Sequence, residues 1–85
     1  MYIGAIAVEP LPEYRLLLTF ENGEKRVFDV EPHLDRGIFR ELRDLSMFRS
    51  VRIHFDSVAW ANGADLCPEM LYEEGVRVEK ESAAA

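Results

Sequence analysis

A strong turn signal between two strand-like runs constrains this chain more than any other feature. The stretch 14–30 (YRLLLTFENGEKRVFDV) holds two runs rich in apolar and β-branched residues on either side of Asn22-Gly23. An Asn-Gly pair flanked by such runs is a strong local signal for a β-hairpin, because both residues tolerate positive φ angles. The sequence therefore predicts an antiparallel hairpin around which the rest of the chain is arranged.

The register of this hairpin follows from which side chains can share a buried face. A two-residue turn would set Leu16 opposite Asp29 and would mix apolar and charged side chains on one face. A three-residue loop, 21–23, with Gly23 in the left-handed conformation sets Leu16 opposite Phe28 instead. The other expected pairs are Tyr14 with Val30 on the apolar face, and Arg15 with Asp29 and Thr19 with Lys25 on the solvated face. One face of the hairpin is thus expected to form the core.

Chain length and composition narrow the remaining possibilities. The 85 residues are expected to form one domain over 1–75, followed by a frayed tail at 76–85. A composition that is 48% apolar and 31% charged is typical of a globular chain rather than a disordered one. No apolar run approaches the roughly 20 residues needed to cross a bilayer, and no secretion signal is recognisable, so the expected location is cytoplasmic.

Charge is distributed unevenly along the chain. The net charge of -6 disfavours phosphate-backbone binding by the surface as a whole. Residues 36–52 nevertheless hold five arginines against two acidic residues, a balance of +3, which leaves -9 for the rest of the chain. This segment is therefore where the chain would bind an anionic partner.

Two further strand regions are expected. Residues 1–9 predict a first strand that ends at Pro10, because proline cannot sit inside a central ladder. Alternation across 51–61 predicts a second hairpin with a turn near Asp56-Ser57. The apolar positions of this second hairpin are Val51, Ile53, Phe55, Val58 and Trp60.

Helical segments complete an α+β fold. A single helical turn is expected at 31–37, and a short helix is expected at 68–74, closing at Gly75. Between them, 38–45 fits a helix, and Met47-Phe48 fits either a further helical turn or a loop. The expected architecture is a small antiparallel sheet built from two β-hairpins plus an N-terminal strand, with two short helices packed on it.

The helix expected at 38–45 carries an arginine ridge. Its apolar stripe consists of Ile38, Phe39, Leu42 and Leu45, and its ridge consists of Arg36, Arg40 and Arg43 on the opposite side. Guanidinium groups bind phosphates or carboxylates through paired hydrogen bonds, so the ridge is a candidate binding surface. The alternative is a solvated helix face neutralised by neighbouring acidic residues.

The segment 60–65 (WANGAD) is a second candidate binding surface. A tryptophan, Trp60, beside the Asn62-Gly63 turn and the acidic Asp65 is a plausible anchor for a protein partner, since tryptophan is enriched among binding hot spots. In the structural alternative, Trp60 continues the buried face of the second hairpin, Asn62-Gly63 forms a turn, and Asp65 caps the following helix.

Few residues point to catalysis or to a metal. His54 and Asp56 share one strand face, the minimum geometry for a carboxylate to orient an imidazole, but no nucleophile accompanies them. Cys67 just before Pro68 could be nucleophilic at a helix N-terminus, although a small, partly buried residue that fills a gap is the preferred interpretation. His33 alone does not make a metal site. No catalytic residue, metal or cofactor is expected.

Several short motifs occur in a fixed order along the chain. They are Phe20-Glu21-Asn22-Gly23-Glu24, Val27-Phe28-Asp29-Val30, Gly37-Ile38-Phe39 with Leu42, Phe48, Trp60 through Asp65, and Pro68-Glu69 with Leu71-Tyr72. This ordered set, over roughly residues 3–74, resembles the bacterial domain of unknown function 2442 family. One departure is Ala61, where the family often has proline. The resemblance implies a small α+β fold with no established enzymatic activity, and an association with antitoxin-like pairs.

Three functions from different classes are open at this point. The leading hypothesis is a non-enzymatic cytoplasmic protein-interaction module, an antitoxin-like member of a two-protein pair, whose partner is a small basic toxin-like protein. A homodimer is a further expectation, because edge strands in so small a sheet need covering. The alternatives are a small ligand-binding domain or enzyme using His54, Asp56 and Cys67, and a nucleic-acid-associated adaptor using the arginine ridge. Direct nucleic-acid binding and membrane binding are not expected. The candidate binding residues are Arg36, Arg40, Arg43, Trp60, Asn62 and Asp65.

Overall fold

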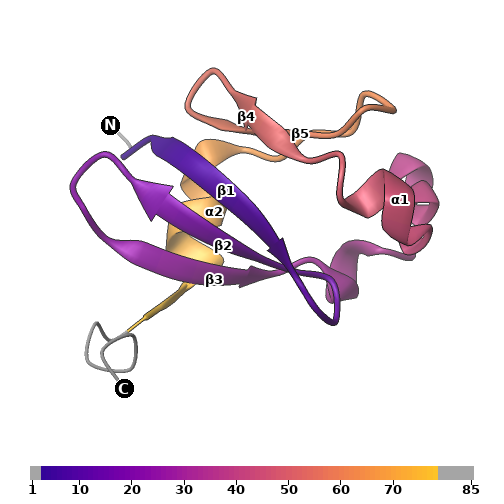
Figure 1. The fold of residues 1–85 in the computed structure, drawn as a ribbon, viewed down its shortest axis with the longest axis horizontal. Coiled ribbons are helices and arrows are strands. Elements are labelled where there is room, and N and C mark those ends of the chain that lie inside the picture. The colour runs from indigo at the N-terminus through magenta and orange to yellow at the C-terminus, as the bar shows by residue number, and fades with distance from the viewer. Residues whose placement is uncertain (1–2, 79–85) are drawn as a thin grey trace.

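A four-stranded antiparallel sheet in the order β1-β2-β3-β6 forms one layer of the computed structural model, which describes residues 3–78 (Figure 1). Helix α2 lies across one face of this sheet, and a separate two-stranded sheet, β4-β5, lies beside β1. The strands are β1 (Ala5–Leu11), β2 (Arg15–Phe20), β3 (Lys25–Asp29), β4 (Arg52–His54), β5 (Ser57–Ala59) and β6 (Val76–Arg77). The helices are η1 (Glu31–His33), η2 (Gly37–Arg43), α1 (Leu45–Phe48) and α2 (Pro68–Glu74). The predicted α+β class is confirmed, with the second hairpin forming its own sheet.

The hairpin of β2 and β3 has the register that the sequence predicts. Leu16 pairs with Phe28, and the other predicted pairs, Arg15 with Asp29 and Thr19 with Lys25, also occur. Gly23 has a φ of 92°, and its N–H donates to the carbonyl of Phe20 at 2.8 Å. Since the loop needs a left-handed residue at this position, glycine takes it without a Cβ penalty.

The core lies on the face of the sheet that α2 and β5 cover. The buried side chains of β2 and β3 are Leu16, Leu18, Phe20 and Phe28, and they pack with Val58, Trp60 and Leu71. Each fully buried side chain of this size contributes about 1.5–3 kcal/mol relative to an exposed one. The opposite face is solvated: Arg15, Lys25 and Asp29 are exposed there.

Strand β1 continues further than the sequence predicts. It runs through Pro10, which pairs with Leu16, to Leu11. The prediction that the strand ends at Pro10 is therefore wrong. Proline is accommodated because β1 is an edge strand of the larger sheet, so one side of its backbone makes no ladder with another strand of that sheet.

The second hairpin turns one residue earlier than predicted. His54 pairs with Ser57, so the two-residue turn is Phe55-Asp56, with φ angles of 48° and 67°. Phe55 consequently leaves the buried face to which alternation assigned it and is 85% exposed. The turn packs against the start of β1, where the Ala5 N–H donates to the Asp56 carbonyl at 2.9 Å.

Two other segments differ from prediction in detail, and one alternative that the sequence left open is decided. The segment 37–43 forms a 3-10 helix rather than the α-helix expected over 38–45, and Met47-Phe48 belongs to the further helical turn α1. Val76 and Arg77 pair with β3 as strand β6, so these two residues are not part of a frayed tail. The rest of the predicted tail beyond residue 78 lies outside the described residues. Among 3–78 there is no helix that is both long and apolar enough to span a membrane.

Candidate functional site

The surface of η2 and α1 combines exposed apolar and basic side chains. A 3-10 helix has three residues per turn, so Phe39 and Leu42 share one side. Leu42 is fully buried, and the Phe39 ring meets Trp60 edge-on at 6.1 Å. Ile38 and Leu45, which the helical stripe assigned to the core, are instead 43% and 55% exposed. The name η2–α1 surface is used below for Arg36, Ile38, Arg40, Arg43 and Leu45.

The arginines of this surface gather only in part. Arg40 and Arg43 are one 3-10 turn apart, and both contact Asp35: Arg43 Nη2 lies 2.7 Å from the carboxylate, and Arg40 Nε donates to the carbonyl at 3.3 Å. Arg36 precedes η2 in an extended conformation. The predicted ridge is therefore a pair of arginines around Asp35, with Arg36 outside the helix that carries the other two.

Trp60 lies in the core rather than on the surface. It is 1% exposed, its Nε1 donates to the Phe48 carbonyl at 3.0 Å, and its ring packs against Phe39 and Phe48. These contacts match the structural alternative for Trp60, since a side chain this buried cannot serve as a partner anchor without unfolding part of the domain.

The Asn62-Gly63 turn secures η2 to the rest of the fold. Asn62 Nδ2 donates to the Glu41 carboxylate at 2.9 Å and to the Ile38 carbonyl at 3.4 Å. Gly63 has a φ of 96°, and Asn62 Oδ1 accepts the Ala64 N–H at 3.0 Å, which closes the turn. The turn thus positions the helix that carries Arg40 and Arg43.

Asp65 does not cap α2, in contrast to the structural interpretation of the sequence. It is exposed and forms an isolated bridge with Ala59 beside β5. The N-cap of α2 is Cys67, which makes no side-chain capping bond. The segment before α2 is held instead by the Ser57 hydroxyl, which donates to the Leu66 carbonyl.

The residues of the enzymatic alternative lie on three different elements. His54 ends β4, Asp56 is in the following turn, and Cys67 precedes α2. Cys67 is exposed, so the interpretation as a partly buried gap-filling residue is wrong. Within residues 3–78 there is no group of three His, Cys, Asp or Glu side chains that could hold a metal. His33 stacks on Phe28, and its Nε2 lies 3.7 Å from Glu74.

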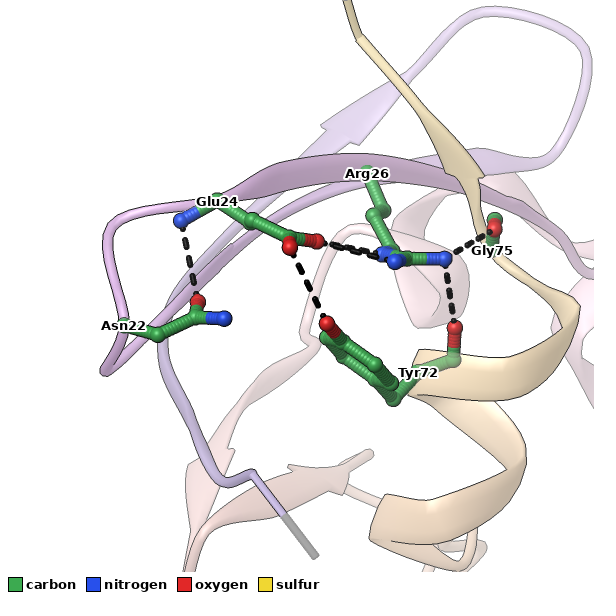
Figure 2. Close-up of polar contacts among 5 residues, drawn as sticks. All are labelled: Asn22, Glu24, Arg26, Tyr72 and Gly75. Carbon is green, nitrogen blue, oxygen red and sulfur yellow. Dashed lines mark hydrogen bonds and ion pairs between the residues drawn. The ribbon is translucent and has the colours of Figure 1, made fainter.

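A cluster that the sequence interpretation missed joins the first hairpin to α2 (Figure 2). The guanidinium of Arg26 pairs with the Glu24 carboxylate at 2.9 Å and donates to the carbonyls of Tyr72 and Gly75. It also lies over the Tyr72 ring, 3.9 Å from the centroid, and the Tyr72 hydroxyl donates to Glu24 at 3.0 Å. We call Glu24, Arg26 and Tyr72 the α2 clamp.

The contacts within the α2 clamp shift the pKa values of Glu24 and Arg26. Partial burial acts to raise the pKa of Glu24, but hydrogen bonds from Arg26 and Tyr72 outweigh burial and hold that pKa below its ordinary value. Burial acts to lower the pKa of Arg26, and the bonds to Glu24 and Tyr72 reverse this and raise it. Because these bonds end a helix and tie it to the sheet, the clamp is a structural device.

Gly75 allows the clamp to close. A Cβ at this position would lie 2.7 Å from the Leu71 carbonyl oxygen and 3.0 Å from the Arg26 Cβ. Glycine is needed here for close approach, because its φ of -67° is open to any residue.

Together these features define a small α+β domain in which polar side chains join the elements and apolar and basic side chains are exposed on η2 and α1. Comparison with known families identifies the group: a family model described as protein of unknown function (DUF2442) matches residues 5–77. The chain belongs to this family, and the resemblance predicted from the motifs is confirmed. Neither a curated protein nor a solved structure matches the chain.

Proposed function

We propose that the domain is a non-enzymatic protein-interaction module that binds its partner through the η2–α1 surface. The observation that carries the proposal is the exposure of Ile38 and Leu45 on the two consecutive helices, η2 and α1, of which η2 also carries the exposed Arg40 and Arg43. Arginine is enriched in protein interfaces, and exposed apolar side chains beside it supply area that a partner can remove from water.

The arginines of this surface are available for exchange with a partner. The Arg43–Asp35 ion pair is exposed on both sides, with side chains that are 57% and 84% accessible. Exposed ion pairs of this kind contribute only about 0–1 kcal/mol, so replacing Asp35 by a partner carboxylate costs little. Such a surface steers association and fixes orientation, while the apolar side chains add affinity.

The specific form of the proposal is an antitoxin-like role in a bacterial cytoplasm. The net charge of -6 supports a small basic toxin-like protein as the partner, because opposite net charges accelerate encounter. The carboxylates of such a partner would meet Arg40 and Arg43, and its basic residues would meet the acidic remainder of the chain. Growth of cells that co-express the two proteins, compared with cells that express the partner alone, tests this role.

Co-purification at moderate salt, followed by mass spectrometry, tests the wider proposal. The expected result is one protein retained in near-equal amount by the wild-type chain and lost with the Arg40→Glu/Arg43→Glu variant. The matched control is Arg15→Glu/Lys25→Glu, which makes the same charge change on the solvated face of the larger sheet. Equal retention by both variants, or retention of RNA or DNA in place of a protein, would contradict the proposal.

A further inference from the structure

Two exposed apolar residues flank the hydrogen bond that joins the β4-β5 turn to the start of β1. Phe55 is 85% exposed in the β4-β5 turn, and Ile6 is 60% exposed on β1. Phe55 precedes Asp56 and Ile6 follows Ala5, and these two neighbours are joined directly by the Ala5 N–H and the Asp56 carbonyl at 2.9 Å. We call Ile6 and Phe55 the tip pair.

Each member of the tip pair owes its exposure to an irregular backbone. Strand β1 shifts register between Ala5 and Ala7, which makes Ile6 the extra residue of a bulge and directs it away from the core. Phe55 has a φ of 48°, in the left-handed region where side chains other than glycine, asparagine and aspartate are disfavoured. Backbone irregularity that persists at a solvent-exposed apolar residue is characteristic of functional sites.

The turn between β1 and β2 shows that strain elsewhere in this domain is compensated. Glu13 and Tyr14 also have positive φ angles, 65° and 60°. The Tyr14 hydroxyl, however, donates to the Arg43 carbonyl at 2.6 Å, and its ring packs edge-on against Phe48 at 5.3 Å. The ring of Phe55 meets the ring of the exposed His54 edge-on at 4.6 Å, but Phe55 is 85% exposed, so burial does little to offset the cost of its backbone conformation.

The tip is held in place although its side chain faces solvent. A Cβ on Gly4 would lie 2.8 Å from the Asp56 Cβ, so the turn sits directly against the backbone at the residue before β1. With the Ala5–Asp56 hydrogen bond, this contact fixes the base of the turn. Because the backbone that carries Phe55 is already ordered, binding needs to order only the side chain, which favours affinity.

We propose that the tip pair is the affinity anchor of this domain, with Phe55 inserting into an apolar pocket of a partner protein. The β4-β5 turn projects from the body of the domain (Figure 1), so its complement is concave. A two-fold dimer through this tip would need a self-complementary surface, which a projecting turn is not. Arg52 and His54 lie two residues apart on β4, next to the turn, and both are exposed. These side chains are complementary to carboxylates at the rim of that pocket.

Other occupants fit the tip less well. A net charge of -6 opposes the phosphates of nucleic acid and the headgroups of an anionic membrane. This inference rests on the proposed interaction function and adds to it the side chain that supplies affinity, in a region separate from the η2–α1 surface.

The test begins with a photo-crosslinking phenylalanine analogue placed at position 55 in cells that express the chain naturally, and at Val76 as a matched site. Val76 is also an exposed apolar residue, 71% accessible, but it lies on β6 at the opposite edge of the larger sheet. The expected result is an adduct with one protein from position 55 and none with that protein from position 76. An adduct with a second copy of this chain, with RNA, or with nothing overturns the inference.

The adduct supports the inference only when the purified partner confirms it. Calorimetric titration of that partner is expected to show affinity at least about 30-fold weaker for Phe55→Asn and unchanged for Val76→Thr. Asparagine tolerates the left-handed turn, so the melting temperature of Phe55→Asn should not fall. Wild-type affinity of Phe55→Asn overturns the inference; if Arg40→Glu/Arg43→Glu weakens the same complex, the proposed function stands without it.

Discussion

The two hairpins of this domain build left-handed turns from opposite kinds of residue. In the β2-β3 loop the left-handed position is Gly23, and Asn22 Oδ1 accepts the Glu24 N–H at 3.0 Å. In the β4-β5 turn the left-handed positions are Phe55 and Asp56. The first loop therefore has the residues that its backbone requires, whereas the second keeps an aromatic residue that its backbone disfavours.

The surroundings of the two hairpins also differ: side chains anchor the first hairpin to the rest of the domain, whereas the aromatic side chain of the second is exposed. The α2 clamp ties the first hairpin to a helix through side chains that are 18% and 20% accessible at Arg26 and Glu24. The second hairpin holds its turn by backbone contacts to β1 and leaves the Phe55 ring in solvent. The comparison indicates that contacts within the domain account for the residues of the first hairpin, whereas the exposed Phe55 of the second is explained by the partner contact that we propose.

Loss of the clamp should have the largest effect on stability. The Arg26→Met substitution removes hydrogen bonds from a charged group to Glu24, Tyr72 and Gly75, and should lower the free energy of unfolding by about 2–3 kcal/mol. The neighbouring Lys25→Met on the exposed face should change it by less than about 0.5 kcal/mol. Urea denaturation of both variants checks this, and equal stability would remove the clamp from the account of the first hairpin.

A smaller loss is expected when the first loop receives a side chain. Gly23→Ala should cost about 1–2 kcal/mol, because alanine is disfavoured at a φ of 92°. A Cβ at this position would meet nothing within 4 Å, so the cost arises from the backbone alone. Thermal unfolding of the variant measures it, and an unchanged melting temperature would show that the loop relaxes at no cost.

The clamp should also make stability depend on pH. The pKa of Glu24 is lower in the folded chain than in the unfolded one, so its stabilising contribution is complete above about pH 4.3 and is lost as pH falls through the folded pKa. The difference in unfolding free energy between the wild type and Glu24→Gln should therefore shrink as the pH is lowered from about 6 to about 3. Urea titrations at several pH values would refute this if the difference stayed constant.

The features that were predictable from sequence depend on neighbours along the chain. Alternation and the Asn22-Gly23 signal were sufficient for the first hairpin and its register, because both act over a few residues. Phe55 was wrongly assigned to the buried face because the alternation of apolar and polar residues is the same up to His54, whether the strand continues or a two-residue turn begins there. Ile38 and Leu45 were misplaced because the period of a 3-10 helix differs from that of an α-helix.

The α2 clamp could be predicted from the sequence only in part. The predicted register already places Arg26 opposite Leu18 on the apolar face, which signals an arginine with an unseen partner. Its partner Tyr72 lies on α2, 46 residues further along, and nothing local links the two. The tip pair was unpredictable for the same reason, since the hydrogen bond between Ala5 and Asp56, the neighbours of Ile6 and Phe55, forms only when β1 packs beside the second hairpin.

The free energy of unfolding of Phe55→Asn tests most directly whether Phe55 is retained for something other than stability. Asparagine suits a left-handed turn position, so urea denaturation should show a gain of about 0.5–1 kcal/mol over the wild type. This is the smallest effect predicted here, and its sign is the decisive quantity. A loss of more than about 0.5 kcal/mol would show that the aromatic ring supports the fold, and would contradict the contrast between the two hairpins.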